Sequence, residues 1–370
     1  MKLKLLKLNN YRNCTNLSLI LDKNKVLIIG KNAQGKTNIL ESIYFLSTLK
    51  SNRTNDIKEL INFNSDFFKI EAEIIKSNTD INLRFACDNN QNKEIKTNNV
   101  KTSAKEFKNI LKTVLFSTQD LRLLRGTPQD RRNWLDKAIS QIYPIYDDKL
   151  SKYEKIKTQK NNFLKHAGKT GILNNELLDV YNEQLAITGS NIIFIRKKYL
   201  NEISTHAKIK HQTISESENL SIKYNNSFLG LSNNIEEIED IKNKYTQALN
   251  EVKQEEIRRW QTCIGPHRDD VVFYINNQEA TKFASQGQQR TIVLALKLSE
   301  LDIIKSKINT TPILLLDDVL AELDDIRQNY LLKSITDNTQ TIITSVDTIL
   351  FENEFLKDVQ IYKIDNGSIL

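Results

Sequence analysis

The sequence predicts an α/β fold: a mixed sheet with an antiparallel β subdomain, interrupted by an inserted helical hairpin. Three observations support this. Apolar runs with period-two alternation fill the first third of the chain. A period of three to four residues replaces them between about 131 and 215, and strands alternate with helices in the last hundred residues. We therefore expect an α/β head made of residues 1–130 and 261–370, with a helical insertion at residues 131–260.

The first third is expected to contain strands and one helix, at residues 36–49. Two of the strands, near residues 68–74 and 81–87, carry an apolar residue at every second position. This pattern is typical of antiparallel strands with one face in water. The other strands are predicted near Leu3–Leu8, Leu17–Leu21, Val26–Ile29 and Val114–Phe116.

The middle of the chain is expected to form an antiparallel helical hairpin, or two ordinary amphipathic helices of a bundle. Apolar residues recur in steps of three and four from Leu178 to Tyr199. A similar seam precedes them from Tyr146 to Ala167, although Lys157 and Lys160 interrupt it. A glycine-bearing turn separates the two seams, and a further helix is expected at residues 235–259.

The last hundred residues are predicted to return to α/β structure. A long, mostly apolar helix is expected at residues 286–304. Strands are predicted at Val271–Ile275, Ile313–Leu316 and Thr339–Ser345, with a closing hairpin at residues 359–370 around an Asn-Gly turn.

A phosphate-binding loop is predicted between the strand at 26–29 and the helix at 36–49. The segment fits the pattern GxxxxGK[ST], in which backbone N–H groups of a glycine-containing loop and a helix N-terminus surround phosphate oxygens. It consists of Gly30, Lys31, Asn32, Ala33, Gln34, Gly35, Lys36 and Thr37. In this pattern the lysine contacts the β- and γ-phosphates and the last hydroxyl binds Mg²⁺. ATP and Mg²⁺ are therefore the expected ligands.

An acidic pair, Asp317 and Asp318, follows the apolar run Ile313–Leu316. Beside a phosphate-binding loop, the first carboxylate after such a buried strand holds Mg²⁺. We expect Asp317 to bind the metal together with Thr37. Lys36 and Asp317 lie roughly 280 residues apart, which indicates an ATPase interrupted by a large insertion.

Ser285, Gly287 and Gln288 stand at the start of the helix at 286–304. A serine and a glycine at a helix N-terminus can offer a hydroxyl and free N–H groups to an anion, or the serine can only cap the helix. Beside a phosphate-binding loop, residues 284–289 resemble the signature motif of ABC ATPases, and residues 321–324 resemble their D-loop. The resemblance implies that these three residues contact the γ-phosphate bound by a second copy of the chain.

These motifs and the insertion together resemble the SMC-like branch of ABC ATPases, and within it the RecF family of bacterial DNA repair proteins. The resemblance spans roughly residues 1–136 and 261–350 and is loose in the helical middle. It is carried by residues 10–13 (NYRN), 30–43 (GKNAQGKTNILESI), 115–121 (LFSTQDL), 131–136 (RRNWLD) and 265–270 (GPHRDD). Gln119 stands where the family usually has glutamate and Ala284 where leucine is common, which leaves open a Q-loop role for Gln119.

The resemblance implies an ATP-dependent homodimer that binds double-stranded, gapped or junction DNA. Such proteins act with RecR-like and RecO-like mediators to help RecA load at gaps, in recombinational repair, replication and the SOS response. We expect ATP to close the dimer on DNA and slow, DNA-stimulated hydrolysis to release it. Asp318 is the expected catalytic carboxylate, with the alternative that it only orients the group that acts.

Composition agrees with a globular protein that can have nucleic acid as a partner. The 370 residues are 39% hydrophobic and carry a formal net charge of +7, with a pI near 9.0. No apolar run approaches about 18 residues. The alternating lysines and leucines of the N-terminus do not resemble a signal peptide, and the three cysteines lack metal-ligand spacing. We expect a cytoplasmic, nucleoid-associated protein.

Basic residues on predicted loops are candidates for contacts with DNA phosphates. They are Lys50, Arg53, Arg122, Arg125, Arg131 and Arg132. Few aromatic residues lie among them, which favours binding to a duplex backbone over stacking on single-stranded bases. Arg12 either approaches the nucleotide phosphates or is solvated. His267, within Gly265–Asp270, either faces the nucleotide or lies in a structural turn.

Two other classes of function compete with a DNA-binding ATPase. The ATPase subunit of an ABC transporter needs a much shorter chain between its loop and its signature than the roughly 250 residues that separate Thr37 from Ser285. A structural SMC-type protein needs a longer arm than the expected hairpin, which has at most about 25 residues a side, or ~40 Å. ATPase activity stimulated by DNA would favour the first class.

Overall fold

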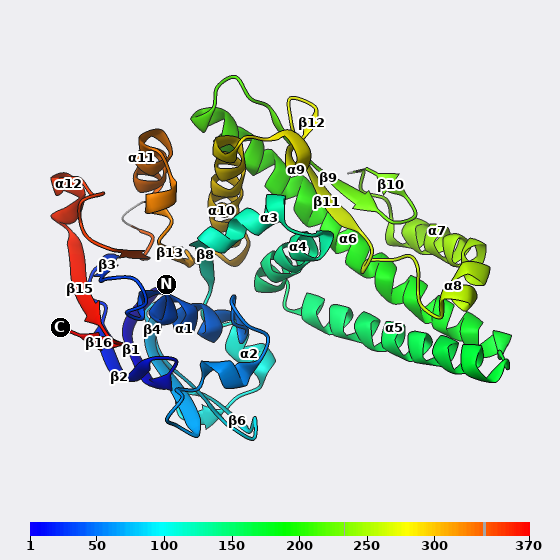
Figure 1. The fold of residues 1–370 in the computed structure, drawn as a ribbon, viewed down its shortest axis with the longest axis horizontal. Helices are drawn as coiled ribbons and strands as arrows, with labels where there is room; N and C mark the ends of the chain where they lie inside the picture. Colours follow the sequence, from blue (N-terminus) through cyan, green and yellow to red (C-terminus); the bar gives the residue numbers. More distant parts are fainter. Residues whose placement is uncertain (233, 336–337) are drawn as a thin grey trace. The chain divides into compact units, whose positions relative to one another are not determined.

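The computed structural model describes residues 1–232, 234–335 and 338–370 (Figure 1). Contacts divide the chain into two compact units: residues 1–120 with 297–370, here the head unit, and residues 121–296, here the arm unit. These boundaries differ from the predicted ones at 130 and 260. Residues 261–296 fold with the insertion because β11 (Asp270–Ile275) pairs with β9 (Leu220–Asn226).

The first sheet of the head unit has the strand order β16-β15-β3-β14-β13-β8. Five of its strands run parallel to one another, and β16 (Ser368–Ile369) pairs antiparallel with β15 as a hairpin. Parallel strands end at the same edge, so the segments that follow β3 and β13 meet there. The parallel strands are β3 (Lys25–Ile29), β8 (Thr113–Ser117), β13 (Ile313–Asp317), β14 (Thr341–Ser345) and β15 (Val359–Asp365).

The second sheet of the head unit is antiparallel, in the order β2-β1-β4-β5-β6-β7. Alternate side chains of β4 are buried, as its period-two pattern predicts. Helix α1 (Lys36–Thr48) has ten buried residues out of 13, and one apolar core joins it to both sheets. The strands are β1 (Lys2–Tyr11), β2 (Cys14–Ile20), β4 (Phe67–Lys76), β5 (Thr79–Asp88), β6 (Lys93–Thr97) and β7 (Val100–Lys101).

Short elements complete the head unit. They are the 3-10 turns Ile57–Leu60, Thr118–Leu121 and Leu320–Glu322, and the helices α2 (Ala104–Lys108), α11 (Asp325–Ser334) and α12 (Asn353–Leu356). Helix α10 (Gln286–Ile308) begins in the arm unit and ends in the head unit.

The arm unit contains helices and a four-stranded antiparallel sheet in the order β10-β9-β11-β12. The predicted helix at 235–259 is two helices, α7 and α8, that meet at Val252. The helices are α3 (Arg122–Arg125), α4 (Pro128–Ile142), α5 (Ile145–Thr170), α6 (Asn175–Ile214), α7 (Ile238–Glu251), α8 (Lys253–Arg259) and α9 (Ala280–Phe283). The short strands are β10 (Gly230–Leu231) and β12 (Gln278–Glu279).

Helices α5 and α6 form the hairpin that the two seams predict. Gly171 ends α5 with a φ of 72°, and the side chain of Asn174 accepts a hydrogen bond from the Leu177 N–H at the start of α6. The two sides are not equal, since α5 has 26 residues and α6 has 40. Helix α6 exceeds the expected 25 because its second half continues past the hairpin, where Arg196 contacts Asp136 of α4.

Lys160 belongs to the core of the hairpin and does not interrupt it. Its side chain is fully buried, and its Nζ donates a hydrogen bond of 2.5 Å to Glu256 of α8, which is also buried. Glu256 accepts a second hydrogen bond from the Cys263 N–H. A buried charge needs such a partner, so α8 supplies the group that lets a lysine occupy this position.

Candidate functional site

The predicted phosphate-binding loop connects β3 to α1 in the head unit. Gly35 has a φ of 108°, and a Cβ there would lie 2.7 Å from Oδ1 of Asn13. A Cβ on Gly30 would lie 2.4 Å from the Ile364 carbonyl oxygen of β15. Close neighbours from both ends of the chain therefore restrict these two positions to glycine.

The C-terminal hairpin supports the loop. The Gly367 N–H donates to the Gln34 carbonyl at 2.8 Å, and the Asn366 N–H donates to the Gln34 side-chain oxygen at 2.5 Å. The sequence predicts the Asn-Gly turn but has no pattern that indicates this contact, because it joins residues more than 330 positions apart.

Lys36 is a buried cation without an acidic partner. Its side chain is 3% exposed, and its Nζ donates to the carbonyl oxygens of Gly30 at 2.7 Å and Lys31 at 3.1 Å. Within residues 1–232, 234–335 and 338–370, no carboxylate lies within ion-pair distance of it. A buried ammonium that contacts only neutral oxygens favours an anion as its ligand.

Thr37 and Asp317 form a set of oxygen ligands beside Lys36. The Thr37 hydroxyl donates to Oδ1 of Asp317 at 2.9 Å, and Oδ1 also accepts from the Thr344 hydroxyl at 3.0 Å. Burial raises the pKa of Asp317, while the two hydroxyl hydrogen bonds oppose that shift. Hydroxyl and carboxylate oxygens are ligands that Mg²⁺ prefers, so these residues fit the predicted metal.

Asp318 lines a cavity of about 440 Å³. The cavity is also lined by Asn32 of the loop, by Ala321 and Glu322 of the predicted D-loop, and by Thr118, Leu320 and residues 344–347, 349 and 350. The backbone of Asp318 has a φ of 52°, and its N–H donates to the Thr344 hydroxyl at 2.9 Å. In the described part of the chain its carboxylate has no hydrogen bond or ion pair, so it can accept a proton from a molecule in the cavity.

Glu41 of α1 forms ion pairs with two arginines, Arg12 and Arg53, next to the loop. Its carboxylate is fully buried and accepts hydrogen bonds from Arg12 at 2.9 and 3.1 Å and from Ser51 at 2.5 Å. Arg53 lies 3.5 Å from it and also donates to Asn38 at 2.7 Å. Sequence reasoning missed Glu41, although a glutamate inside an apolar helix was a usable signal.

The predicted signature residues lie at the N-terminus of α10, in the arm unit. Ser285 and Gln288 cap the helix reciprocally, with the Gln288 N–H donating to the Ser285 hydroxyl at 3.2 Å and the Ser285 N–H donating to the Gln288 side chain at 2.7 Å. Gln288 also donates to Glu218 at 2.8 Å. Gly287 lies in the first turn. The capping role is therefore present, and the contact with a partner's phosphate stays a prediction.

We compared the chain with protein-family models and with curated proteins. Residues 2–369 match the model of the RecF/RecN/SMC N terminal domain. The chain is 38% identical over 367 residues to the DNA replication and repair protein RecF of Bacillus subtilis (strain 168), covering 99% of this chain and 98% of that protein. It is 39% identical over 366 residues to RecF of Bacillus cereus (strain G9842), with 98% and 97% covered.

The chain belongs to the RecF family. A solved structure of a RecF protein is 33% identical to it, with a TM-score of 0.91 over 100% of this chain and 96% of that one. A Smc head at 14% identity has a TM-score of 0.56, which concerns the fold alone. The predicted family and fold class are confirmed, and membership of the RecF family favours the first of the three functional classes. In the described residues, no helix is long and apolar enough to span a membrane.

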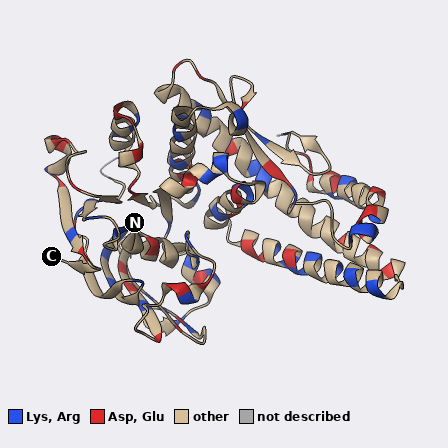
Figure 2. Ribbon diagram, in the orientation of Figure 1, with Lys and Arg blue, Asp and Glu red and all other residues tan. Residues whose placement is uncertain are grey.

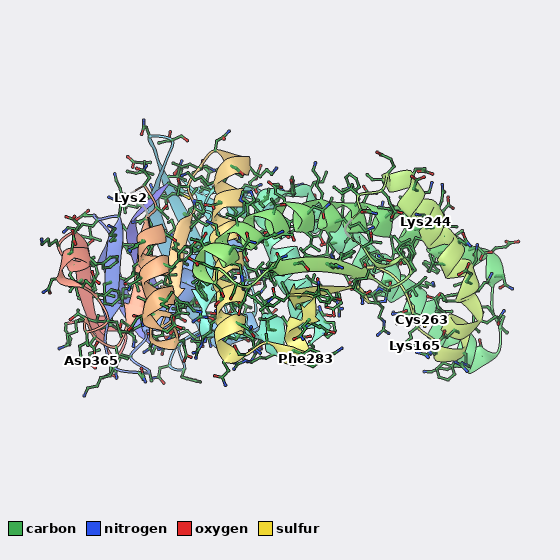
Figure 3. The ribbon with its side chains drawn as sticks, turned by 90° about the horizontal axis from the view of Figure 1, so that it is seen from above. Lys2, Lys165, Lys244, Cys263, Phe283 and Asp365 are labelled. Carbon is green, nitrogen blue, oxygen red and sulfur yellow. The ribbon has the colours of Figure 1, made fainter. Side chains whose placement is uncertain are left out.

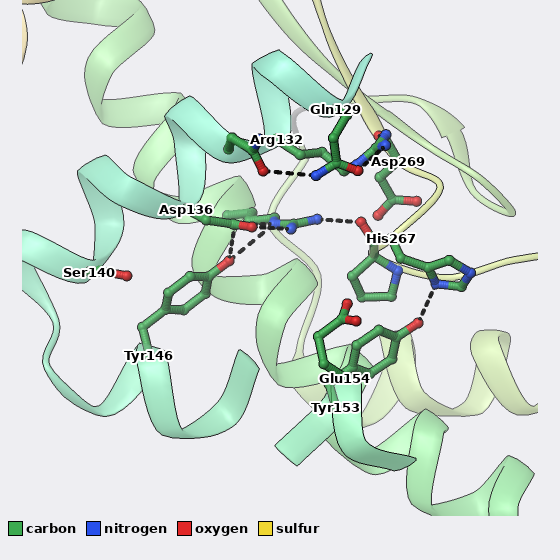
Figure 4. Close-up of polar contacts among 12 residues, drawn as sticks. Gln129, Arg132, Asp136, Ser140, Tyr146, Tyr153, Glu154, His267 and Asp269 are labelled. Atoms are coloured by element: carbon green, nitrogen blue, oxygen red, sulfur yellow. Dashed lines mark hydrogen bonds and ion pairs between the residues drawn. The ribbon is translucent and has the colours of Figure 1, made fainter. Parts of the chain in front are cut away.

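Residues 265–270, one of the segments that resemble the RecF family, form a turn. This is one of the two alternatives given above for His267. The Arg268 N–H donates to the Gly265 carbonyl at 2.8 Å. His267 contacts the Tyr153 hydroxyl through Nδ1 at 2.7 Å (Figure 4). Its Nε2 lies 3.3 Å from the Thr262 carbonyl oxygen. A carbonyl only accepts, so Nε2 carries the proton and Nδ1 accepts from Tyr153.

Buried ionic groups attach this turn to the helices of the arm unit. Arg196 is fully buried and donates to both carboxylate oxygens of Asp136 at 2.9 Å and to the Pro266 carbonyl at 2.6 Å. Asp269 accepts hydrogen bonds from Tyr224 at 2.5 Å and Asn226 at 3.0 Å. Residues 265–270 thus form a structural junction with α4, α6 and β9.

The predicted DNA-contacting residues fall into two groups. Lys50, Arg53, Arg122 and Arg125 are exposed, and Arg132 is half-buried with hydrogen bonds to the Asp269 carbonyl and to Gln129. Arg131 is 7% exposed and forms a two-pronged ion pair with Asp270 at 2.7 and 2.9 Å. The prediction for Arg131 is wrong, because its guanidinium is occupied inside the arm unit. Gln119 follows β8 in a 3-10 turn, and its role stays open.

The burial of His267 predicts a pH dependence of stability. Burial, aided by nearby Lys157, lowers the pKa of His267 from 6.5 to about 3. A lowered folded-state pKa makes the unfolded chain bind the proton more readily, so stability falls as the pH drops from about 6.5 toward 3. Between about pH 7 and pH 5 the unmodified chain should lose up to about 2 kcal/mol more unfolding free energy than His267→Gln.

Urea denaturation of both proteins at several pH values measures this difference. Glutamine can still accept from Tyr153 and donate to Thr262, and all other titrating groups are common to both proteins. If the unfolding free energies of the unmodified chain and of His267→Gln changed equally with pH, the fold would not hold His267 neutral.

Proposed function

We propose that the chain is an ATP-dependent DNA-binding protein of recombinational repair, in which ATP and Mg²⁺ are held by the head unit and completed by a second copy. The observation that carries the proposal is Lys36, a buried ammonium whose contacts are two carbonyl oxygens. A polyphosphate supplies the missing negative charge. Two similar RecF structures, described as RecF-ATP and RecF-ATPrS in the RecFOR pathway, support ATP as that ligand.

Each part of the loop has a role in binding. Backbone N–H groups of residues 30–35 and the N-terminus of α1 surround the phosphates, and Lys36 contacts the β- and γ-phosphates. Thr37 and Asp317 hold Mg²⁺, which, when bound, neutralises charge that develops on the phosphate oxygens. Arg12 and Arg53, held by Glu41, add positive charge beside α1.

Hydrolysis needs a water molecule, a base and a stabilised leaving group. Asp318 is the proposed base: its carboxylate takes a proton as the water oxygen bonds to the γ-phosphorus. The bond from that phosphorus to the bridging oxygen of ADP breaks, which yields ADP and phosphate. The carboxylate of Asp318 lines the cavity and has no hydrogen bond or ion pair among the described residues, which supports this role.

The second copy contributes Ser285, Gly287 and Gln288 to the same site. The N-terminus of α10 can offer its free N–H groups and the Ser285 hydroxyl to the γ-phosphate. ATP then stabilises the homodimer, and its hydrolysis releases it. The family supports a role in which the closed dimer binds duplex, gapped or junction DNA and, with RecR-like and RecO-like mediators, assists RecA loading.

Replacing the buried lysine tests the nucleotide site. Lys36→Ala should weaken ATP binding by two orders of magnitude or more, on the order of 3 kcal/mol, because the phosphates no longer receive a charge-assisted hydrogen bond from a buried ammonium. Titration with a fluorescent ATP analogue measures the affinity. Lys23→Ala removes an exposed lysine in the turn before β3 and is the matched control. Equal affinities for the two variants would refute the assignment of Lys36.

Replacing Asp318 separates binding from hydrolysis. Asp318→Asn keeps the size of the side chain but cannot accept the proton, so ATP affinity should be retained while turnover slows by about 10²–10⁴-fold. Phosphate release under saturating ATP and DNA measures the rate. If turnover is unchanged while ATP still binds, Asp318 is not the base and only orients another group.

A further inference from the structure

Helix α5 carries a lysine-rich exposed face, and the one acidic residue beside it, Glu154, has 47% of its side chain exposed and is paired with Lys157. From residue 151 to residue 170, every exposed position is lysine, histidine, glycine, threonine, serine, glutamine or asparagine. The lysines of this face are Lys152, Lys155, Lys165 and Lys169, spaced so that they share one side of the helix. In the described residues none of the four has an acidic partner.

The other lysines of this stretch are already neutralised. Lys157 pairs with Glu154, the one acidic residue between 149 and 170, at 2.5 Å. Lys160 pairs with Glu256 in the core. The four exposed lysines therefore leave a net charge of +4 on this face, here called the α5 basic face. Figure 2 shows blue segments along α5, with its red segments gathered in the first half.

Neighbouring surfaces of the arm unit do not share this character. The exposed residues at the start of α6 include Glu176, Asp179 and Glu183, together with apolar Leu177 and Val180. On α7, Lys244 is bound by Glu236. Figure 3 shows Lys165 near the far end of the hairpin and Lys244 on the other side of the arm. Four unpaired lysines are thus gathered on one side of α5, whereas the start of α6 is acidic and Lys244 is paired.

We propose that the α5 basic face binds the phosphate backbone of duplex DNA, an inference that rests on the DNA-binding function proposed above and extends it to the arm. Short hydroxyl and amide side chains between the lysines add donors that phosphate oxygens accept. Lys152 and Lys169 are about 26 Å apart along the helix, close to the length of seven or eight base-pair steps.

The composition of this face selects duplex backbone over single-stranded bases. Binding to single strands uses exposed aromatic side chains on which bases stack. Between residues 151 and 170, His166 is the one exposed residue with an aromatic ring. Phe163 instead packs against Tyr181 of α6, with 5.8 Å between the ring centroids. Binding through phosphates alone predicts affinity that is independent of sequence and strongly dependent on salt.

A quadruple variant tests the proposal in the full chain: Lys152→Gln, Lys155→Gln, Lys165→Gln and Lys169→Gln. Glutamine keeps the helix propensity of lysine and removes the charge. With ATP present, affinity for a short fluorescent duplex should fall by tenfold or more at roughly 0.1 M salt, and the slope of log K against log salt should fall by about 0.9 for each phosphate that is no longer neutralised. Fluorescence anisotropy at several salt concentrations measures both.

Two matched variants complete the test. Lysine-to-arginine substitutions at the same four positions should restore binding, because the charge returns. Glutamine at Lys23, Lys58, Lys101 and Lys357, four exposed lysines of the head unit, makes the same change in net charge and should reduce affinity by less than about twofold. Far-UV circular dichroism and ATP affinity check that the fold is retained.

Unchanged duplex affinity and an unchanged salt slope in the first variant would overturn the proposal and leave an acidic protein as the occupant of this face. If the unmodified chain itself failed to bind duplex DNA, the proposed DNA-binding function would be contradicted instead. The two failures are therefore distinguishable.

Discussion

The hydrogen bond between Thr37 and Asp317 depends on β14, which pairs in parallel with β3 on one side and with β13 on the other. In this register Asp317 lies opposite Thr344, and Thr344 lies opposite Ile28, one residue before β3 ends. The two oxygen ligands of the proposed metal site, roughly 280 residues apart in sequence, therefore come together only when both ends of the chain share one sheet. The contacts of Gly30 with Ile364 and of Gln34 with Gly367 impose the same requirement.

The insertion does not merely separate these two ends, because it has a polar core of its own. Arg196 and Asp269 are buried and fully engaged with neighbours from α4, β9 and the turn at 265–268. Breaking one partner of such a network leaves a buried charge without compensation, which costs several kcal/mol. The segment that leads to α10 is thereby attached to the helices of the arm. This attachment, together with the pairing of β9 with β11, holds residues 261–296 in the same unit as the insertion.

Local patterns predicted the parts of the site that depend on local structure. The strand before Gly30, the helix after Thr37 and the apolar run before Asp317 each follow from periodicity and residue type, and the RecF-family segments follow from short motifs. The pairing of Arg131 with Asp270 and of Lys160 with Glu256 could not be predicted, because each joins residues about a hundred or more positions apart. Alternation at Leu220, Ile222 and Tyr224 was a usable signal for β9, and its partner strand would have moved the predicted boundary at 260.

That two copies of the chain share one nucleotide site is tested most directly by mixing two inactive variants. Ser285→Arg keeps the phosphate-binding loop but blocks the N-terminus of α10, and Lys36→Ala does the reverse. A mixed dimer then has one site with both defects and one site with neither. ATP hydrolysis should therefore return when the two proteins are combined, although each alone is inactive. No recovery, in a mixture where mass spectrometry or light scattering shows that mixed dimers form, would contradict a shared site and place every nucleotide contact within one chain.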